Sequence, residues 1–362
     1  MTGSGRPILV TGGAGFIGAN VADRLASEGH AVLVYDALAR AGVADNLAWL
    51  RQRHPGRVIP IIADINDATE LTRAMGEADA VFHLAAQVAV TSSLDDPAAD
   101  FAVNLRGTLG VLEAARRQDR PVPVIFASTN KVYGDLADIP LGLQGEAYVP
   151  HPDAIRLHGI GEDRPLDFHT PYGCSKGAAD QYVLDYARSF GVPSAVFRMS
   201  CIYGPLQRGT EDQGWVAHFL LRALARQAIS IYGDGCQVRD ILFVDDAVDA
   251  YVAAWRRIKA VQGRAFNLGG GPANAVSLLQ VIGAIEETIG SRVEIRHGAW
   301  RAGDQRYYVS DTRRARQAFG LPAPKPWRQG LQALAAWLST ERVPAEAASH
   351  ESGSVQRAME RC

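Results

Sequence analysis

Short apolar runs alternate along this chain with longer stretches in which apolar residues recur at helical spacing. Each run is continuously apolar, which is typical of a strand buried on both faces of a parallel sheet. Parallel strands need a crossover helix between them, so the alternation predicts a doubly wound α/β sheet with helices on both faces. The runs lie at 8–11, 31–35, 58–63, 80–85, 124–128, 194–200 and 241–244.

The pattern changes near residue 200, where Gly204-Pro205 interrupts the chain and the later segments become irregular. This change predicts a large sheet domain followed by a smaller α/β lobe for substrate. The expected division gives 1–200 and the returning segment 238–262 to the sheet domain, and 201–237 with 263–340 to the lobe.

Two segments carry no helix or strand period. Residues 135–169 are rich in Gly and Pro, and a loop that long inside a domain is usually functional, often a lid. Residues 343–362 hold few large apolar groups, so we expect a disordered tail there.

A glycine-rich turn follows the first apolar run directly. Gly12, Gly15 and Gly18 stand three apart, between the strand at 8–11 and a helical pattern. Such glycines permit a tight turn and let the backbone approach a pyrophosphate, which lies on the helix N-terminus. Asp36 ends the second run, where a carboxylate bonds the adenosine ribose hydroxyls and disfavours a 2′-phosphate. The sequence therefore predicts a Rossmann-type fold that binds NAD rather than NADP.

A tyrosine and a lysine stand four residues apart, at Tyr172 and Lys176. Residues at this spacing share a helix face, and an ammonium near a phenol favours the phenolate. A free tyrosine titrates near pH ~10, too high for a base at neutral pH, so we expect Lys176 to lower the pKa of Tyr172. Thr129 adds a hydroxyl at the end of the run 124–128. The three residues form a proton-transfer group suited to oxidising an alcohol or reducing a ketone.

Charge and cysteine spacing exclude several classes of site. The net charge is -2 and no basic stripe is present, so nucleic acid is not an expected partner. The four cysteines lack C-x-x-C spacing, which argues against a zinc site or a disulfide framework and fits a reducing cytoplasm. No apolar run is long enough to span a bilayer, so we expect no membrane segment. Together with the cysteine spacing, this predicts a cytoplasmic protein without a metal site.

These motifs resemble one family, the extended short-chain dehydrogenases/reductases that act on sugar nucleotides. The likeness extends over residues 7–340, and its general motifs are 11–18, 128–134, the Tyr172/Lys176 pair and Ile202-Tyr203-Gly204-Pro205. A narrower likeness, to the 2-epimerases of CDP-linked sugars within that family, is carried by 128–135, 165–182, 209–215 and 304–308.

The resemblance implies three sets of site residues. The catalytic residues it implies are Thr129, Tyr172 and Lys176. The NAD-binding residues it implies are Gly12, Gly15, Phe16, Ile17, Gly18, Asp36, Leu38, Arg40, Asp64, Ile65, Leu84, Ala85, Ala86, Gln87, Asn104, Tyr172 and Lys176. The substrate-binding residues it implies are Asn130, Lys131, Cys201, Arg208, Gln213, Arg239 and Arg301. Among these, Arg239 and Arg301 match family positions that hold the pyrophosphate, for which a planar guanidinium is well suited.

The resemblance also separates two reactions. The 4,6-dehydratases of the family carry Thr-Asp-Glu where this chain has Thr129-Asn130-Lys131, and their Asp and Glu eliminate water. Asparagine does not titrate and lysine is not a carboxylate base, so elimination is not expected. The expected function is epimerisation of a nucleotide-diphosphate sugar, with CDP favoured, through a transient keto sugar at C2 and return of the hydride from the same bound NAD.

Two other functions stay open. One is a 4-epimerase, or a net dehydrogenase or reductase, of another sugar nucleotide. The other is a non-catalytic NAD-binding sensor, which the fold alone does not exclude but which the catalytic trio argues against. Relatives form dimers through helices that correspond to 97–117 and 172–190, so we expect a homodimer or homotetramer.

Overall fold

The computed structural model describes residues 5–301 and 303–340, and its centre is a parallel sheet of seven strands in the order β3-β2-β1-β4-β5-β8-β12. This is the strand order of doubly wound dinucleotide-binding sheets with one further strand, so the predicted Rossmann-type fold is confirmed. The strands are β1 (Ile8–Thr11), β2 (Val32–Asp36), β3 (Val58–Ile62), β4 (Val81–His83), β5 (Val124–Thr129), β8 (Ser194–Met199) and β12 (Arg264–Leu268).

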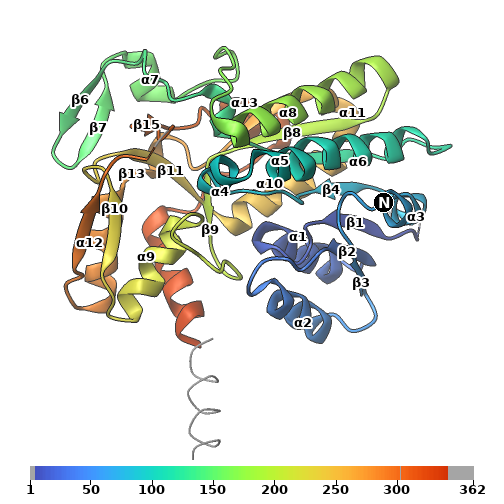
Figure 1. Cartoon of the computed structure of the whole chain (residues 1–362), viewed down its shortest axis with the longest axis horizontal. Helices are drawn as coiled ribbons and strands as arrows, with labels where there is room; N and C mark the ends of the chain where they lie inside the picture. The colour runs from blue at the N-terminus through green and yellow to red at the C-terminus, as the bar shows by residue number, and fades with distance from the viewer. Residues whose placement is uncertain (1–4, 302, 341–362) are drawn as a thin grey trace, which may run out of the picture.

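Helices cover both faces of this sheet (Figure 1). Successive side chains of a strand point to opposite faces, so Ile8 and Val10 enter one hydrophobic core while Leu9 enters the other. The first core is closed by α1 (Phe16–Ser27), α2 (Val43–Arg53), α10 (Val244–Arg256), α11 (Ile258–Val261) and α13 (Arg313–Phe319). The second is closed by α3 (Ala68–Glu77), α6 (Gly107–Arg116) and α8 (Thr170–Phe190).

Three short helical segments precede α6 and pack against α8. They lead the chain from the end of β4 to the side of α8. They are α4 (Val90–Asp95), α5 (Pro97–Phe101) and a π-helical turn (Ala102–Arg106).

The remaining strands form small sheets beside the main one. β11 (Val238–Phe243) pairs with β13 (Ala275–Ser277), β15 (Tyr307–Tyr308) and β9 (Cys201–Tyr203), while β10 (Ile229–Tyr232) pairs with β14 (Ile295–Gly298). A third hydrophobic core lies among these strands, α9 (Trp215–Leu224), α12 (Leu278–Ile289) and the helical segment that starts at residue 327. Figure 1 shows β10, α9 and α12 side by side, away from the seven-stranded sheet.

Two predicted assignments along this part of the chain are wrong. The run 241–244 was expected in the main sheet, but residues 241–243 belong to β11 in the small sheet, and β12, expected in the lobe, is an edge strand of the main sheet. Both strands mix apolar with polar residues and end in a buried apolar residue, Phe243 or Leu268, so their composition does not distinguish the two sheets. Residues 244–261 do return to the main sheet, as α10 and α11. The division into two domains stays a prediction, and the expected tail at 343–362 lies outside the described residues.

The segment 135–169 is not the irregular loop that its composition predicts. It contains a hairpin of β6 (Leu141–Gln144) and β7 (Ala147–Pro150), followed by α7 (Asp153–His158). Figure 1 shows the hairpin on the side that carries β13 and β15, with which β7 is in contact. Strands of four residues are too short to produce a clear alternation of apolar and polar positions, so they were not predicted from the sequence.

The turn between β1 and α1 depends on glycine. Gly12 has φ +67°, and a Cβ on it would lie 2.6 Å from the Ala85 backbone nitrogen. A Cβ on Gly18 would lie 2.1 Å from the Gly12 carbonyl oxygen. These approaches bring the start of α1 against both its own turn and the end of β4, so the turn has no room for a side chain.

We expect Gly12→Ala to lower the free energy of unfolding by about 2 kcal/mol, because it adds a left-handed alanine and a backbone clash. Urea denaturation measures this change. Gly283→Ala is the matched control: Gly283 lies inside α12, and a Cβ added there would meet nothing within 4 Å, so alanine should stabilise the helix by about 1 kcal/mol. Equal effects at the two positions would contradict the role given to the turn.

Candidate active site

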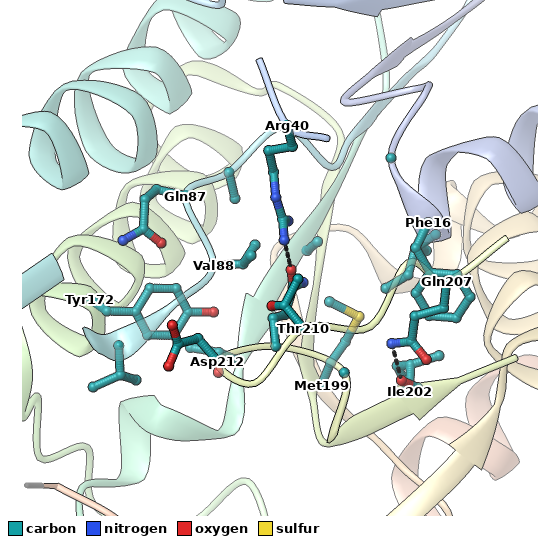
Figure 2. A pocket seen from close by; sticks show the side chains of 18 of the residues that line it. Phe16, Arg40, Gln87, Val88, Tyr172, Met199, Ile202, Gln207, Thr210 and Asp212 are labelled. Atoms are coloured by element: carbon teal, nitrogen blue, oxygen red, sulfur yellow. Dashed lines mark hydrogen bonds between the residues drawn. The ribbon is translucent and has the colours of Figure 1, made fainter. Parts of the chain in front are cut away.

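A single cleft of about 880 Å³ runs from the glycine turn across the carboxyl ends of the main-sheet strands to the small sheets. It gathers nearly all the residues that the sequence analysis named, including the catalytic trio, the glycines of the turn and the three arginines Arg208, Arg239 and Arg301. Of the named residues, only Leu38 and Asn104 do not line it. Figure 2 shows the Tyr172 hydroxyl pointing into this cleft, with Phe16 on the opposite side.

The dinucleotide end of the cleft is formed by the glycine turn and the end of β2. Gly12, Gly15 and Gly18 line the cleft at the start of α1, where the backbone N–H groups of a helix N-terminus can bind a pyrophosphate. Asp36 accepts hydrogen bonds from the backbone N–H groups of Ala14 (3.0 Å) and Leu38 (2.9 Å). Its carboxylate is thereby fixed at the cleft edge, where it suits ribose hydroxyls. The residues present therefore fit NAD.

Leu38 has a different part from the one expected. Its φ of +52° accompanies the bond between its N–H group and Asp36, and its side chain packs against the first hydrophobic core. Ala37 and Ala39, on either side of it, line the cleft instead. Asp64 and Ile65, after β3, do line the cleft as expected.

Asn104 is fully buried behind the cleft wall rather than in it. Its side chain accepts from the Gln87 N–H group and donates to the Gln87 carbonyl oxygen, each at 3.0 Å. It therefore shapes the segment after β4 that borders the cleft at 84–87, and the expected direct contact with NAD is not supported by its position. The π-helical turn that contains Asn104 widens the helix there and turns this side chain toward Gln87.

The three residues predicted to be catalytic come from two elements. Thr129 ends β5, while Tyr172 and Lys176 lie one turn apart near the start of α8. All three side chains are buried, and the Lys176 ammonium lies 4.2 Å from the centre of the Phe126 ring. The predicted shared helix face is present.

Burial controls the protonation of this pair. It raises the pKa of Tyr172 to about 12, and a hydrogen bond with Thr129 opposes that rise. Burial lowers the pKa of Lys176 to about 7. The expected lowering of the Tyr172 pKa by Lys176 is therefore not found in this structure, because desolvation disfavours the charged form of both groups.

Asn130 and Lys131 occupy the next turn and are both held by the segment 303–305. The Asn130 amide donates to Gln305 Oε1 at 3.0 Å, and Lys131 Nζ donates to the Gly303 carbonyl oxygen at 3.0 Å. Burial and the nearby Arg239 guanidinium lower the pKa of Lys131 to about 8. Neither residue supplies a carboxyl group to the cleft.

The two arginines expected at the pyrophosphate are each paired with carboxylates. Arg239 bonds Asp304 Oδ1 at 2.6 Å, and Arg301 lies 3.2 Å from Asp212 Oδ1. Arg301 also stacks over the Tyr232 ring at 3.9 Å. Both guanidinium groups line the cleft, so an anion there would compete with or share these pairs.

Three further predicted residues lie around the loop 208–214. Gln213 accepts a hydrogen bond from Arg40, which Figure 2 shows reaching across the cleft toward this loop. Arg208 lies 3.7 Å from Asp45 of α2. Cys201 is a half-buried thiol whose sulfur accepts from Trp215 Nε1 at 3.3 Å, and burial raises its pKa. The sequence placed all of these correctly at the cleft, while their roles stay predictions.

Sequence reasoning missed several residues that shape the site. Asp304 and Gln305 were seen only as part of a motif, although Asp304 pairs with Arg239 and Gln305 orients Asn130. Asp100 was not seen at all, although it lies four residues before Asn104, a spacing that places both on one helix face.

Metal and membrane sites were not expected. Over 5–301 and 303–340, no group of three or more His, Cys, Asp or Glu side chains is arranged to hold a metal ion. Within the same ranges, no helix is both long and apolar enough to cross a bilayer.

Comparison with known proteins places this site in a family. The model of the NAD-dependent epimerase/dehydratase family matches residues 8–269. The chain is 39% identical to CDP-paratose 2-epimerase of Salmonella typhi over 92% of its own length and 99% of that protein. It is 35% identical to UDP-glucose 4-epimerase of Mycolicibacterium smegmatis, over 89% and 95% of the two chains.

A solved structure has the same fold. UDP-glucose 4-epimerase of Thermotoga maritima, crystallised with UDP-glucose, superposes with a TM-score of 0.79 at 29% identity, over 92% of this chain and 99% of that one. These findings confirm the predicted family and its cofactor. The chain belongs to the NAD-dependent epimerase/dehydratase family and is an enzyme of the sugar-nucleotide branch of it.

Proposed function

We propose that this protein inverts C2 of a nucleotide-diphosphate sugar, with a CDP-linked sugar as the favoured substrate. The observation that carries the proposal is the pairing of a Thr129–Tyr172–Lys176 site with Asn130 and Lys131 beside it. The first three residues suit the oxidation of a sugar hydroxyl, and the last two lack the carboxyl groups that elimination requires. The 39% identity with a CDP-paratose 2-epimerase over almost the whole chain supports the choice of C2 and of CDP.

The residues divide the proton transfer between them. Tyr172 takes the proton from the sugar hydroxyl, and Thr129, which hydrogen-bonds the phenol, orients that hydroxyl. NAD, when bound, would supply the hydride acceptor and donor that the oxidation and its reversal need. Lys176 supplies a positive charge on the same helix face. General acid–base help of this kind contributes about 10²–10⁴-fold to rate.

The buried environment makes positive charge necessary here. Because desolvation raises the pKa of Tyr172 to about 12, the phenolate forms at neutral pH only where cations offset the burial. Lys176 loses its own proton easily, since burial lowers its pKa to about 7. The proposed reaction needs the opposite of what burial favours: Lys176 must stay protonated while Tyr172 gives up its proton.

Asn130 and Lys131 are fixed in ways that disfavour dehydration. The Asn130 amide is bonded to Gln305, and the Lys131 ammonium is bonded to the Gly303 carbonyl oxygen. An acid and a base on both sides of the C5–C6 bond are what elimination needs, and an amide and an ammonium do not provide that pair. Hydride return to the opposite face is the remaining outcome of the oxidation.

Epimerisation at C4 is the second candidate. It is favoured by the 35% identity with a UDP-glucose 4-epimerase and uses the same three catalytic residues. The two reactions differ in which hydroxyl lies against Tyr172, and therefore in how the sugar is held between the two ends of the cleft.

The first prediction concerns the reaction itself. With no NAD added, proton NMR in D2O should detect inversion of CDP-paratose at C2 without uptake of deuterium, because the hydride is held on a retained cofactor. CDP-glucose and UDP-glucose are run in parallel. Inversion at C4 would favour the second candidate, and deuterium at C6 with a 4-keto product would overturn the role given to Asn130 and Lys131.

The second prediction concerns Tyr172. Tyr172→Phe should lower turnover by about 10²–10⁴-fold while NAD binding is retained, because only the proton-transferring oxygen is lost. The matched control is Tyr186→Phe, which removes the same atom from the same helix where it bonds Glu113 at 2.8 Å. Near-wild-type turnover in Tyr172→Phe would remove this residue from its role.

The third prediction concerns assembly. The proposal includes a homodimer or homotetramer formed through the helical segments of 97–117 and through 172–190 of α8, on which Phe101, Tyr182 and Phe190 are large and about half exposed. Light scattering at micromolar concentration should give at least twice the mass of the chain. A purely monomeric particle would contradict the proposal, and Phe101→Lys should reduce the mass if this face is the interface.

A further inference from the structure

Asp100 is a buried carboxylate behind the wall of the cleft. It lies in α5 and is only 1% exposed, although carboxylates are rarely buried without a partner. Its two oxygens accept hydrogen bonds from Asn104 Nδ2, at 3.0 Å, and from Ser175 Oγ. The proposed proton transfer uses none of these atoms directly.

The two hydrogen-bond partners of Asp100 contact different parts of the proposed reaction centre. Ser175 immediately precedes Lys176, and its hydroxyl also lies 3.2 Å from the Tyr172 carbonyl oxygen. Asn104 holds the backbone of Gln87 at the cleft edge through two bonds of 3.0 Å. Asp100 therefore joins the catalytic turn of α8 to the segment after β4.

The titratable groups near Lys176 lie on the next turn of α8, on β4 and on α5. Asp180, one turn further along α8, is buried but already paired with Arg198 of β8 at 2.9 Å. His83 of β4 is fully buried, and burial with the nearby Lys176 lowers its pKa to about 3, so it is neutral. Among the described residues no ion pair involves Asp100. Burial raises the pKa of Asp100, whereas its hydrogen bonds with Ser175 and Asn104 and the nearby Lys176 ammonium favour the carboxylate.

We propose that Asp100 is a positioning residue that fixes the Tyr172–Lys176 turn against the Gln87 segment and provides the buried counter-charge for the Lys176 ammonium. This inference rests on the proposed function for its meaning in catalysis. Its physical content, the effect of one carboxylate on one ammonium, can be measured without any substrate.

The direction of the effect is fixed by the signs of the charges. Burial lowers the pKa of Lys176, while the carboxylates of Asp180 and Asp100 raise it. The same Asp100 charge raises the pKa of Tyr172, because it repels the phenolate. Removing the charge should therefore move the titrations of both catalytic groups to lower pH. A residue that only packs the helix would leave them where they are.

The chain makes this measurement practical, because it has only four lysines: Lys131, Lys176, Lys259 and Lys325. With lysine labelled by 13C at Cε, a carbon–proton correlation spectrum of the NAD-loaded protein should contain four resonances. Lys176→Arg identifies the resonance of Lys176 by its loss. The midpoint of its pH titration is then read in wild-type protein and in Asp100→Asn.

We expect Asp100→Asn to lower that midpoint by about one pH unit, since a nearby opposite charge shifts a titration by about one unit or more. Asparagine has the shape of aspartate and can still accept from Ser175. The control is Asp96→Asn: Asp96 is an exposed residue that caps the same helix by accepting from the Ala99 N–H group, a role asparagine fills equally well. If Asp100→Asn does not fold, Asp100→Ser is measured instead with the same expectation.

The kinetic readout separates this inference from the proposed function. In Asp100→Asn the pH profile of kcat/KM for the epimerised sugar nucleotide should move as a whole to lower pH, whereas Asp96→Asn keeps the wild-type profile. A Lys176 midpoint equal to that of wild type would overturn the inference even if the enzyme epimerises its substrate. If Asp100→Asn lowers the midpoint of the Lys176 titration but the wild-type protein epimerises no sugar nucleotide, the proposed function is overturned. The effect of the Asp100 charge on the Lys176 pKa is then still supported.

Discussion

The parallel strands of the main sheet all end at one edge, and the site depends on this constraint. The carboxyl ends of β1, β2, β4 and β5 bring the glycine turn, Asp36, the Gln87 segment and Thr129 to one cleft, although they are up to about a hundred residues apart in the chain. α8 then crosses this edge and adds Tyr172 and Lys176. The chemistry follows from the topology, because no other edge of the sheet collects these groups.

Burial creates the central electrostatic problem of the site. Removing water favours neutral tyrosine and neutral lysine, whereas the proposed reaction uses the phenolate and the ammonium. Charged groups around Lys176 offset part of this effect. Asp180 is also paired with Arg198 and His83 carries no charge, so the carboxylates of Asp180 and Asp100 together oppose the loss of the Lys176 proton. The attraction between these carboxylates and the Lys176 ammonium acts over a short range, because the energy of two charges falls with their distance and with the dielectric constant of the partly hydrated protein.

The sequence predicted the parts of the fold whose signals are local. The strand at 8–11, the glycine turn and Asp36 lie in one continuous segment, and the structure places them as expected. β11 and β12 were exchanged between sheets because the pairing of a short strand depends on distant partners rather than on its own composition. Asn104 was expected to touch the cofactor, but a π-helical turn directs it to the backbone of Gln87, and no composition rule signals such a turn. The pKa of Tyr172 was misjudged since the spacing of a lysine says nothing about desolvation.

The hairpin of β6 and β7 has a consequence for how this enzyme could be divided or recombined. The hairpin lies in the chain between β5 and α8, yet the backbone N–H group of Tyr148 donates to the Cys236 carbonyl oxygen at 3.0 Å, just before β11. Leu141 and Ile155 pack on Tyr307 and Val309, and the Ile160 N–H group bonds the Val309 carbonyl oxygen at 2.7 Å. The segment inserted after β5 is thus packed against β15 and the residues that precede β11. A chimera that takes residues 236–309 from a relative must therefore bring a matching insertion after β5, or the apolar side chains of Leu141 and Ile155 lose their partners and are exposed to water.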